Sequence, residues 1–252
     1  MKIPLLTSTL YIFILIHKKF MQILKLLSTA LFFSFICSAD CLANRADDSP
    51  MLIGYIGHPR VVSHYNDIIA RTYSRLGISV EFIEVGGERG LRLLDKGVTD
   101  ADTIRYELAA NDFSNFFVVH PVIAKGATIL LCMRDSPCVA NILSNPKIAI
   151  AATTRFNVNT DHCGLVITAD IREYDRFDQV VNLLVSGRYD YALLPTDFSD
   201  EATFKNLGAQ HRVIVEHDIV HVVNNKYLHL QEDLSEALSA VLKEVNAITT
   251  RN

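Results

Sequence analysis

The chain has 252 residues, half of them apolar, and a formal net charge of −4. This length allows one large or two ordinary domains, with enough apolar residues for well-packed cores. The acidic balance argues against a nucleic-acid partner and against binding to an anionic membrane surface, since both need a basic face.

Residues 1–43 end in the pattern of a signal peptide. A charged start at Met21 leads into an apolar run and then to small residues that offer cleavage after Ala39 or Ala43. The apolar run is shorter than the ~20 residues that a membrane span needs. A second apolar piece lies upstream of Met21, so either translation starts at Met21, which we favour, or the upstream piece is an N-terminal membrane helix. We expect cleavage and a periplasmic product.

Strands alternating with helices are expected along the mature chain. In the first part, the apolar patterns predict strands at 51–56, 78–85 and 100–105 and helices over 68–76 and 88–96. Further on, they predict extended segments at 116–120 and 127–133, strands at 147–152, 165–169, 191–194 and 213–223, and helices over 177–184 and 234–245. Alternation of this kind indicates βαβ units and a largely parallel sheet.

Two stretches carry the same local pattern. Leu93–Asp102 lines up with Leu183–Ala192, and each reads as a helix end, a glycine, a short turn with Asp and a strand. The glycines, Gly97 and Gly187, stand where a left-handed residue ends a helix. The chain therefore builds one unit twice, once in each of two lobes, and a cleft between lobes is where small molecules bind.

No Pro-rich or Gly-rich linker separates the lobes, which favours a tight, twice-crossed hinge. We expect residues 44–125 and 205–252 to form lobe 1, because the late strand returns to it, and residues 126–204 to form lobe 2.

The order of these motifs resembles that of the type II periplasmic solute-binding proteins. It is closest to the short, stand-alone members of the amino-acid-binding branch, the bacterial extracellular solute-binding protein family 3. The resemblance is carried by Gly87–Gly90, Gly97–Asp102, Pro121-Val122, Gly187–Ala192 and Asp233–Leu238. It implies a two-lobed α/β fold of the periplasmic-binding-protein-like type II class, with a ligand cleft between the lobes and no cofactor. It also implies a monomer that serves an inner-membrane ABC transporter permease or a membrane sensor.

The family's amino-acid clamps are not at their usual positions. The resemblance places a carboxylate-binding Arg where this chain has Asp112, and an ammonium-binding Asp where it has Pro195. Arg105 and Asp197 are the nearby residues that could replace them.

Candidate site residues lie at the expected strand ends, where open α/β sheets bind ligands. Arg89 either pairs with Asp102 or holds a ligand anion, Tyr55 either packs in the core or stacks on a ligand, and Arg155 is either a ligand residue or merely solvated. The full set is Tyr55, His58, Arg89, Arg105, Thr153, Arg155, Thr196 and Asp197.

Metal binding and nucleophilic catalysis find no supporting motif. His162 and Cys163 are adjacent and cannot easily face one ion, and His217 and His221 are too far apart if they share a strand. In an oxidising compartment the other two mature cysteines, Cys132 and Cys138, either form a disulfide across a short loop or stay as free thiols.

The sequence therefore predicts a non-enzymatic, exported protein that captures a small polar or anionic, amino-acid-like molecule by hinge closure, for transport or sensing. One alternative is a sensory input module that docks on a membrane signalling protein. Another is a small dehydratase-like enzyme on the same fold, with Glu88, Asp102 or His58 as general acid or base.

Overall fold

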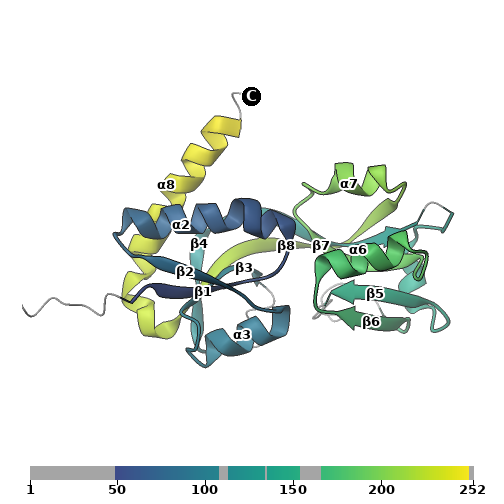
Figure 1. Cartoon of the computed structure of the whole chain (residues 1–252), viewed down its shortest axis with the longest axis horizontal. Helices are drawn as coiled ribbons and strands as arrows, with labels where there is room; N and C mark the ends of the chain where they lie inside the picture. Colours follow the sequence, from purple (N-terminus) through teal and green to yellow (C-terminus); the bar gives the residue numbers. More distant parts are fainter. Residues whose placement is uncertain (1–48, 108–112, 134, 154–165, 250–252) are drawn as a thin grey trace, which may run out of the picture. The chain divides into compact units, whose positions relative to one another are not determined.

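The computed structural model describes residues 49–107, 113–133, 135–153 and 166–249 (Figure 1). The expected signal peptide and Arg155 lie outside these ranges. The compact unit that contains the fold spans Pro50–Asn252. No helix in the described part of the chain is long and apolar enough to cross a membrane. The elements are, in order, β1 (Met51–Tyr55), η1 (Val61–Tyr65), α2 (Asn66–Arg75), β2 (Val80–Glu84), α3 (Gly87–Asp95), β3 (Ala101–Tyr106), β4 (Phe116–Cys132), η2 (Ala140–Ser144), β5 (Ala149–Thr153), β6 (Asp170–Tyr174), α6 (Phe177–Val185), β7 (Tyr191–Thr196), α7 (Glu201–Asn206), β8 (Gln210–Asn224), η3 (Asn225–Leu230) and α8 (Gln231–Thr249).

The described strands form one eight-stranded sheet in the order β2-β1-β3-β8-β4-β7-β5-β6. Its two halves are built alike. In the first half β1 pairs in parallel with β2 and β3, and β8 runs antiparallel to β3. In the second half β5 pairs in parallel with β6 and β7, and β4 runs antiparallel to β7. The predicted two-lobed α/β architecture is present, with each lobe formed around one half of this sheet.

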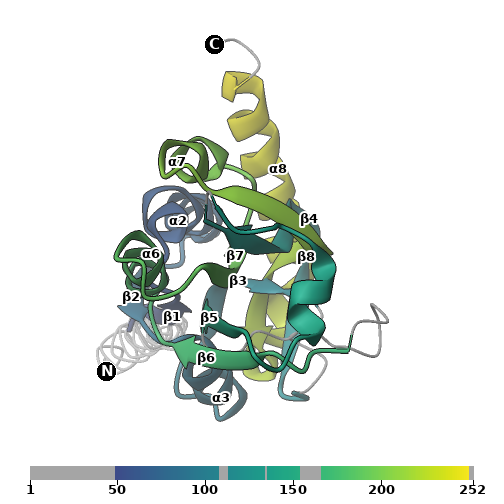
Figure 2. The same ribbon diagram turned by 90° about the vertical axis from the view of Figure 1, so that its right-hand side faces the viewer.

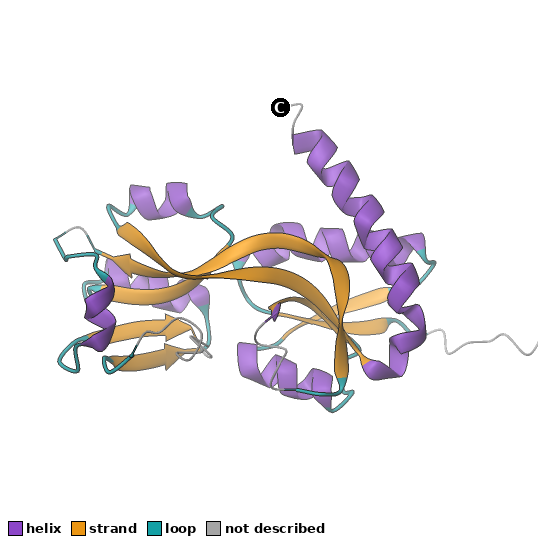
Figure 3. Ribbon diagram, turned by 180° about the vertical axis from the view of Figure 1, so that it is seen from behind, coloured by secondary structure: helices purple, strands orange, loops and turns teal. Residues whose placement is uncertain are grey.

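The strands β4 and β8 join the two halves. They pair antiparallel from Phe116 opposite Asn224 to Cys132 opposite Gln210, with shifts in register on the way, and the views agree in placing them side by side (Figures 2 and 3). The two extended segments expected around Pro121 are therefore one long strand. The late strand returns to β3, as predicted, because β8 pairs with it.

Helices cover both faces of the sheet and bury its apolar side chains. In the first half α2 and α8 pack on one face and α3 on the other. In the second half α6 and α7 cover one face and η2 the other. Strand β7 shows why both faces are covered: Ala192 and Leu194 point to the α6 side, while Tyr191 and Leu193 point to the η2 side.

The repeated helix-to-strand unit is present in both halves. Gly97 after α3 and Gly187 after α6 both have φ of 69°. Their N–H groups bond to the carbonyls of Leu94 and Leu184 at 2.9 and 3.0 Å, so both helices end in the same way. Strands β3 and β7 then begin, and both enter the sheet beside the first strand of their half.

One predicted strand is wrong within its described part. Residues 166–169 are not a strand, and β6 begins at Asp170. The N–H groups of Thr168 and Ala169 bond to the carbonyl of Leu143 at the end of η2, so these residues dock on that turn instead of joining the sheet. The short helix α7 has no counterpart among the sequence predictions.

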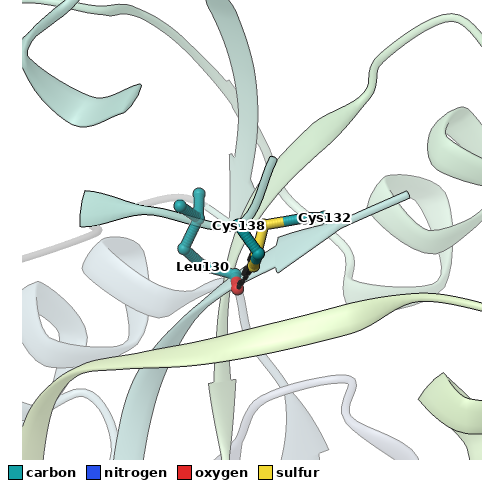
Figure 4. The surroundings of a disulfide bond; sticks show 3 residues. All are labelled: Leu130, Cys132 and Cys138. Atoms are coloured by element: carbon teal, nitrogen blue, oxygen red, sulfur yellow. Dashed lines mark hydrogen bonds between the residues drawn. A yellow bond between two sulfur atoms is a disulfide. The ribbon is translucent and has the colours of Figure 1, made fainter. Parts of the chain in front are cut away.

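A disulfide joins Cys132, the last residue of β4, to Cys138, with a Cα–Cα distance of 5.6 Å (Figure 4). Both sulfur atoms lie near the carbonyl oxygen of Leu130. Cys132 is fully buried in the cluster beneath η2. The bond therefore ties the chain segment that precedes η2 to the sheet that η2 covers.

Candidate functional site

A cavity of about 150 Å³ lies between the two halves of the sheet. The first half contributes residues from the β1–η1 segment, α3 and β3, and the second half contributes the ends of β5 and β7 and the start of α6. The crossing strands contribute Thr128 from β4 and His217 and Ile219 from β8. The lining residues are Ile56, Gly57, His58, Arg60, Val61, Tyr65, Gly87, Leu91, Ile104, Arg105, Tyr106, Thr128, Thr153, Asp175, Phe177, Pro195, Thr196, Asp197, His217 and Ile219.

Asp197 connects the two sides of the cavity. It follows β7 directly, and its carboxylate accepts hydrogen bonds from Tyr65 Oη at 2.5 Å and from Arg60 Nε at 3.3 Å. Its other oxygen accepts bonds from the backbone and hydroxyl of Ser199. Burial acts to raise the pKa of Asp197, but the bonds from Ser199 and Tyr65 together lower it. This carboxylate is therefore ionised and engaged on both oxygens.

A second bridge lies beside it. Nε2 of the buried His58, after β1, is 3.5 Å from a carboxylate oxygen of Asp200, before α7. The ring of Phe177 packs edge-on against His58, with centroids 4.2 Å apart. Burial lowers the pKa of His58, with Asp200 acting in the opposite direction, and burial also raises the pKa of Asp200. Both shifts favour uncharged forms.

Arg105 is paired inside its own strand. Its guanidinium donates to Asp102, although residues three apart in a regular strand face opposite sides. A register shift between these two residues in the β3–β8 pairing brings them to the same side. Gly90 of α3 makes room for the pair, because a Cβ there would collide with the guanidinium.

The pair is almost entirely buried. Asp102 is 1% exposed and Arg105 8%. Burial raises the pKa of Asp102 to about 6, against the lowering effect of Arg105. Asp102 Oδ1 and Arg105 Nε have no hydrogen-bond partner among the described residues.

His217 contributes an unpaired polar atom to the lining. It comes from β8, and its Nε2 is 2.9 Å from Thr128 Oγ1 of β4. Its ring stacks on that of Tyr106, with centroids 4.3 Å apart. Burial lowers the pKa of His217, so the ring is neutral at pH 7. Within the described ranges Nδ1 is buried and has no partner.

Five of the eight residues proposed from sequence line this cavity: His58, Arg105, Thr153, Thr196 and Asp197. Tyr55 does not; its ring packs against Phe82 next to the first-half core. Arg89 is exposed and outside the lining, and Asp102 pairs with Arg105 in its place. Arg155 is outside the described residues.

Sequence reasoning missed Arg60, Tyr65, Tyr106 and His217 as lining residues. His217 was weighed only as a metal ligand; its i, i+2 spacing to Ile219 on a strand was the signal that it shares a face with an apolar lining residue. No cluster of three metal-binding side chains occurs among the residues described.

No protein-family model and no curated protein matches the sequence. Solved structures do match. Arginine-bound ArgBP from T. maritima, in a glycine-to-alanine mutant, aligns with a TM-score of 0.60 at 16% identity over 77% of this chain and 95% of that one. An ancestral amino-acid-binding protein, described as a precursor of cyclohexadienyl dehydratase, aligns with a TM-score of 0.63 at 15% identity, over 82% of this chain and 94% of that one. A histidine kinase sensor domain similar to periplasmic binding proteins aligns with a TM-score of 0.61 at 16% identity, over 80% of this chain and 94% of that one. The resemblance read from the sequence is thus confirmed at the level of the fold.

Proposed function

We propose that this chain, which has the fold of the type II periplasmic binding proteins, is a solute-binding protein that captures a small molecule between its lobes. One observation carries the proposal. Tyr65 from one side of the cavity bonds to Asp197 from the other, so the two sides meet through polar contacts around a mainly apolar cavity. A protein of this kind needs only a ligand that prefers the closed state.

The crossing strands support hinge closure. In our proposal lobe 1 comprises residues 44–125 and 205–252 and lobe 2 residues 126–204, so β4 and β8 carry the chain across the boundary twice. Gly126 lies at this crossing, where a Cβ would come within 2.8 Å of Ile219 and 2.9 Å of the Thr196 carbonyl. Short crossings of two strands allow bending without a long linker.

Export and a membrane partner complete the proposal. The N-terminal signal pattern supports delivery to the periplasm, where the protein would act as a monomer with an inner-membrane permease or sensor. The similarity to a kinase sensor domain favours sensing as a second candidate function.

Binding is a better fit than catalysis. The described carboxyl with the clearest upward shift in pKa, Asp102, does not line the cavity and is paired with Arg105. The general acid of a dehydratase must reach its substrate. Asp102 is therefore not placed to act on a substrate in the cavity, and His58, which does line it, is held between Phe177 and Asp200.

A ligand screen tests the proposal. The purified protein is screened by thermal shift against amino acids, polyamines, small carboxylates, carboxamides and alcohols, and each positive is measured by calorimetry. We expect at least one compound to bind with 1:1 stoichiometry and to raise Tm with concentration. Absence of binding across all five classes would contradict a solute-binding role.

A further inference from the structure

The charged side chains around the cavity are engaged within the chain. Arg60 pairs with Asp197 and Arg105 with Asp102, whereas His58 Nε2 lies 3.5 Å from Asp200 Oδ2 without a hydrogen bond. Asp175, the other charged residue of the described lining, also interacts within the chain. The charges of both arginines are therefore already balanced within the chain.

An anionic ligand meets a specific obstacle. Arg105 Nε has no partner among the described residues, but the guanidinium charge is already balanced through Nη2 by Asp102, which is 1% exposed and would be strongly unfavourable if left unpaired. Around the cavity two arginines are accompanied by four aspartates, so an added anion also meets like charges. They are Arg60, Arg105, Asp102, Asp175, Asp197 and Asp200.

A cationic ligand finds no open carboxylate in the described lining. Asp197 already accepts hydrogen bonds on both of its carboxylate oxygens. Asp200 Oδ2 has no hydrogen-bond partner among the described residues, but Asp200 is not part of the lining. Asp102 is behind the lining and not part of it. An ammonium group would therefore lose its water without gaining a free carboxylate.

His217 offers the contact that a neutral ligand needs. The residue is 5% exposed and lines the cavity, and its Nδ1 is buried without a hydrogen-bond partner in the described structure. Depending on the tautomer set by Thr128, Nδ1 either donates or accepts a hydrogen bond. A hydroxyl or an amide can satisfy both cases.

The rest of the wall is mainly apolar. Side chains from both halves and from β8 face the space, and they suit a hydrocarbon or aromatic body. They are Ile56, Val61, Leu91, Ile104, Phe177 and Ile219.

From these observations we infer that the cavity selects an uncharged small molecule with an apolar body and one hydroxyl or amide group that hydrogen-bonds to His217. The inference rests on the proposed function and narrows its ligand class. It departs from the amino acids named for the structural neighbours, which carry a charged carboxylate and ammonium.

A matched set of probes tests the charge preference. Calorimetry compares 2-phenylethanol, phenylacetamide, phenylacetate, phenethylamine and L-phenylalanine, and a parallel set replaces the phenyl group by an isopropyl group. The alcohol or the amide should bind at least roughly tenfold more tightly than the acid, the amine and the amino acid of its set, since the ions must give up hydration without a partner.

Two variants test the named contacts. His217→Phe keeps the ring against Tyr106 but removes the hydrogen bond, so affinity for the neutral probe should fall roughly three- to tenfold. His211→Gln, at an exposed position on the same strand, is the matched control and should bind as the wild type does. Asp102→Asn removes the internal partner of Arg105, so phenylacetate should gain roughly tenfold in affinity.

The outcomes separate the two proposals. Preference for the acid or the amino acid, or an unchanged affinity in His217→Phe, overturns the uncharged-ligand inference and leaves the solute-binding function standing. If no probe of any charge binds and the wider screen is also negative, the proposed function fails and the inference with it.

Discussion

Tyr65 Oη donates a 2.5 Å hydrogen bond to Asp197 Oδ2, joining two residues that are far apart in the chain and lie on opposite sides of the cavity. Both side chains are less than a tenth exposed. The bond to an ionised acceptor raises the pKa of Tyr65, after the larger effect of burial. This contact links the two halves of the sheet outside the crossing strands.

A double-mutant cycle measures that link. Tyr65→Phe and Asp197→Ala should each destabilise the protein, and their coupling energy should be about 1–3 kcal/mol, as for a buried hydrogen bond to a charged group. Urea unfolding of the four proteins gives the value. Strictly additive effects would show that the two side chains contribute independently.

Replacing Gly90 by a larger residue should destabilise the protein, because there is no room for a side chain at this position. Its added Cβ would meet the Arg105 guanidinium, Val85 at 3.0 Å and Asp102 at 3.2 Å. Gly90→Ala should therefore destabilise by about 1–3 kcal/mol, even though alanine is normally the better helix former. Gly86→Ala is the control, because nothing lies within 4 Å of its Cβ position. Equal stability of both variants, measured by urea unfolding, would contradict the packing argument.

Much of the fold was predictable because its signals are local. The helix stripe ending at Gly187 and the apolar strand after it lie within a few residues of each other, and the structure confirms both. The contact between Tyr65 and Asp197 has no such signal, because only the folded chain brings them together. The Asp102–Arg105 pair was missed because a regular strand would separate them, and the register shift that unites them leaves no mark in the sequence.

His221 should make stability depend on pH. It is fully buried, its Nδ1 lies 2.8 Å from the Asp102 carbonyl, and its Nε2 lies 3.0 Å from Tyr73 Oη. Burial lowers its pKa from 6.5 to about 4, although the carbonyls of Thr103 and Asp102 act to raise it. As the pH falls, the His221 ring is therefore protonated near pH 6.5 in the unfolded chain but only near pH 4 in the folded protein. The histidine therefore costs on the order of 2 kcal/mol of stability between pH 7 and pH 5.

The Asp102 carboxyl acts in the opposite direction over part of that range. Its pKa is raised to about 6, so the folded protein binds its proton more readily than the unfolded chain as pH falls. Comparing wild type with His221→Gln isolates the histidine: the variant should lose less stability on acidification. Parallel pH profiles, or a His221 ring that titrates near 6.5 by NMR, would contradict the prediction.

The Cys132–Cys138 bond should give a small stabilisation. It closes a short loop, so reduction should cost less than about 3 kcal/mol. Intact-mass analysis of alkylated protein, with and without reductant, should show two additional alkyl groups after reduction. Labelling of both cysteines without reductant would mean that the thiols are free.

The signal pattern predicts a shortened protein. Material recovered from the periplasm should begin just after Ala43, or after Ala39 as the second choice. N-terminal sequencing decides between these sites. Membrane-bound protein with residue 1 intact would show that the upstream apolar segment acts as an anchor.

Because β4 and β8 both run from one half of the sheet to the other, the order in which the strands are synthesised affects when each ladder can form. Strand β7 finds its antiparallel neighbour in β4, which is made before it, so the ladder between these two strands can form once Thr196 is made. Strand β3 must wait for β8, which ends at Asn224. Both halves therefore need β8 for a full sheet, because it pairs with β4 as well as with β3, and a chain that stops before β8 leaves both of these strands with an open edge.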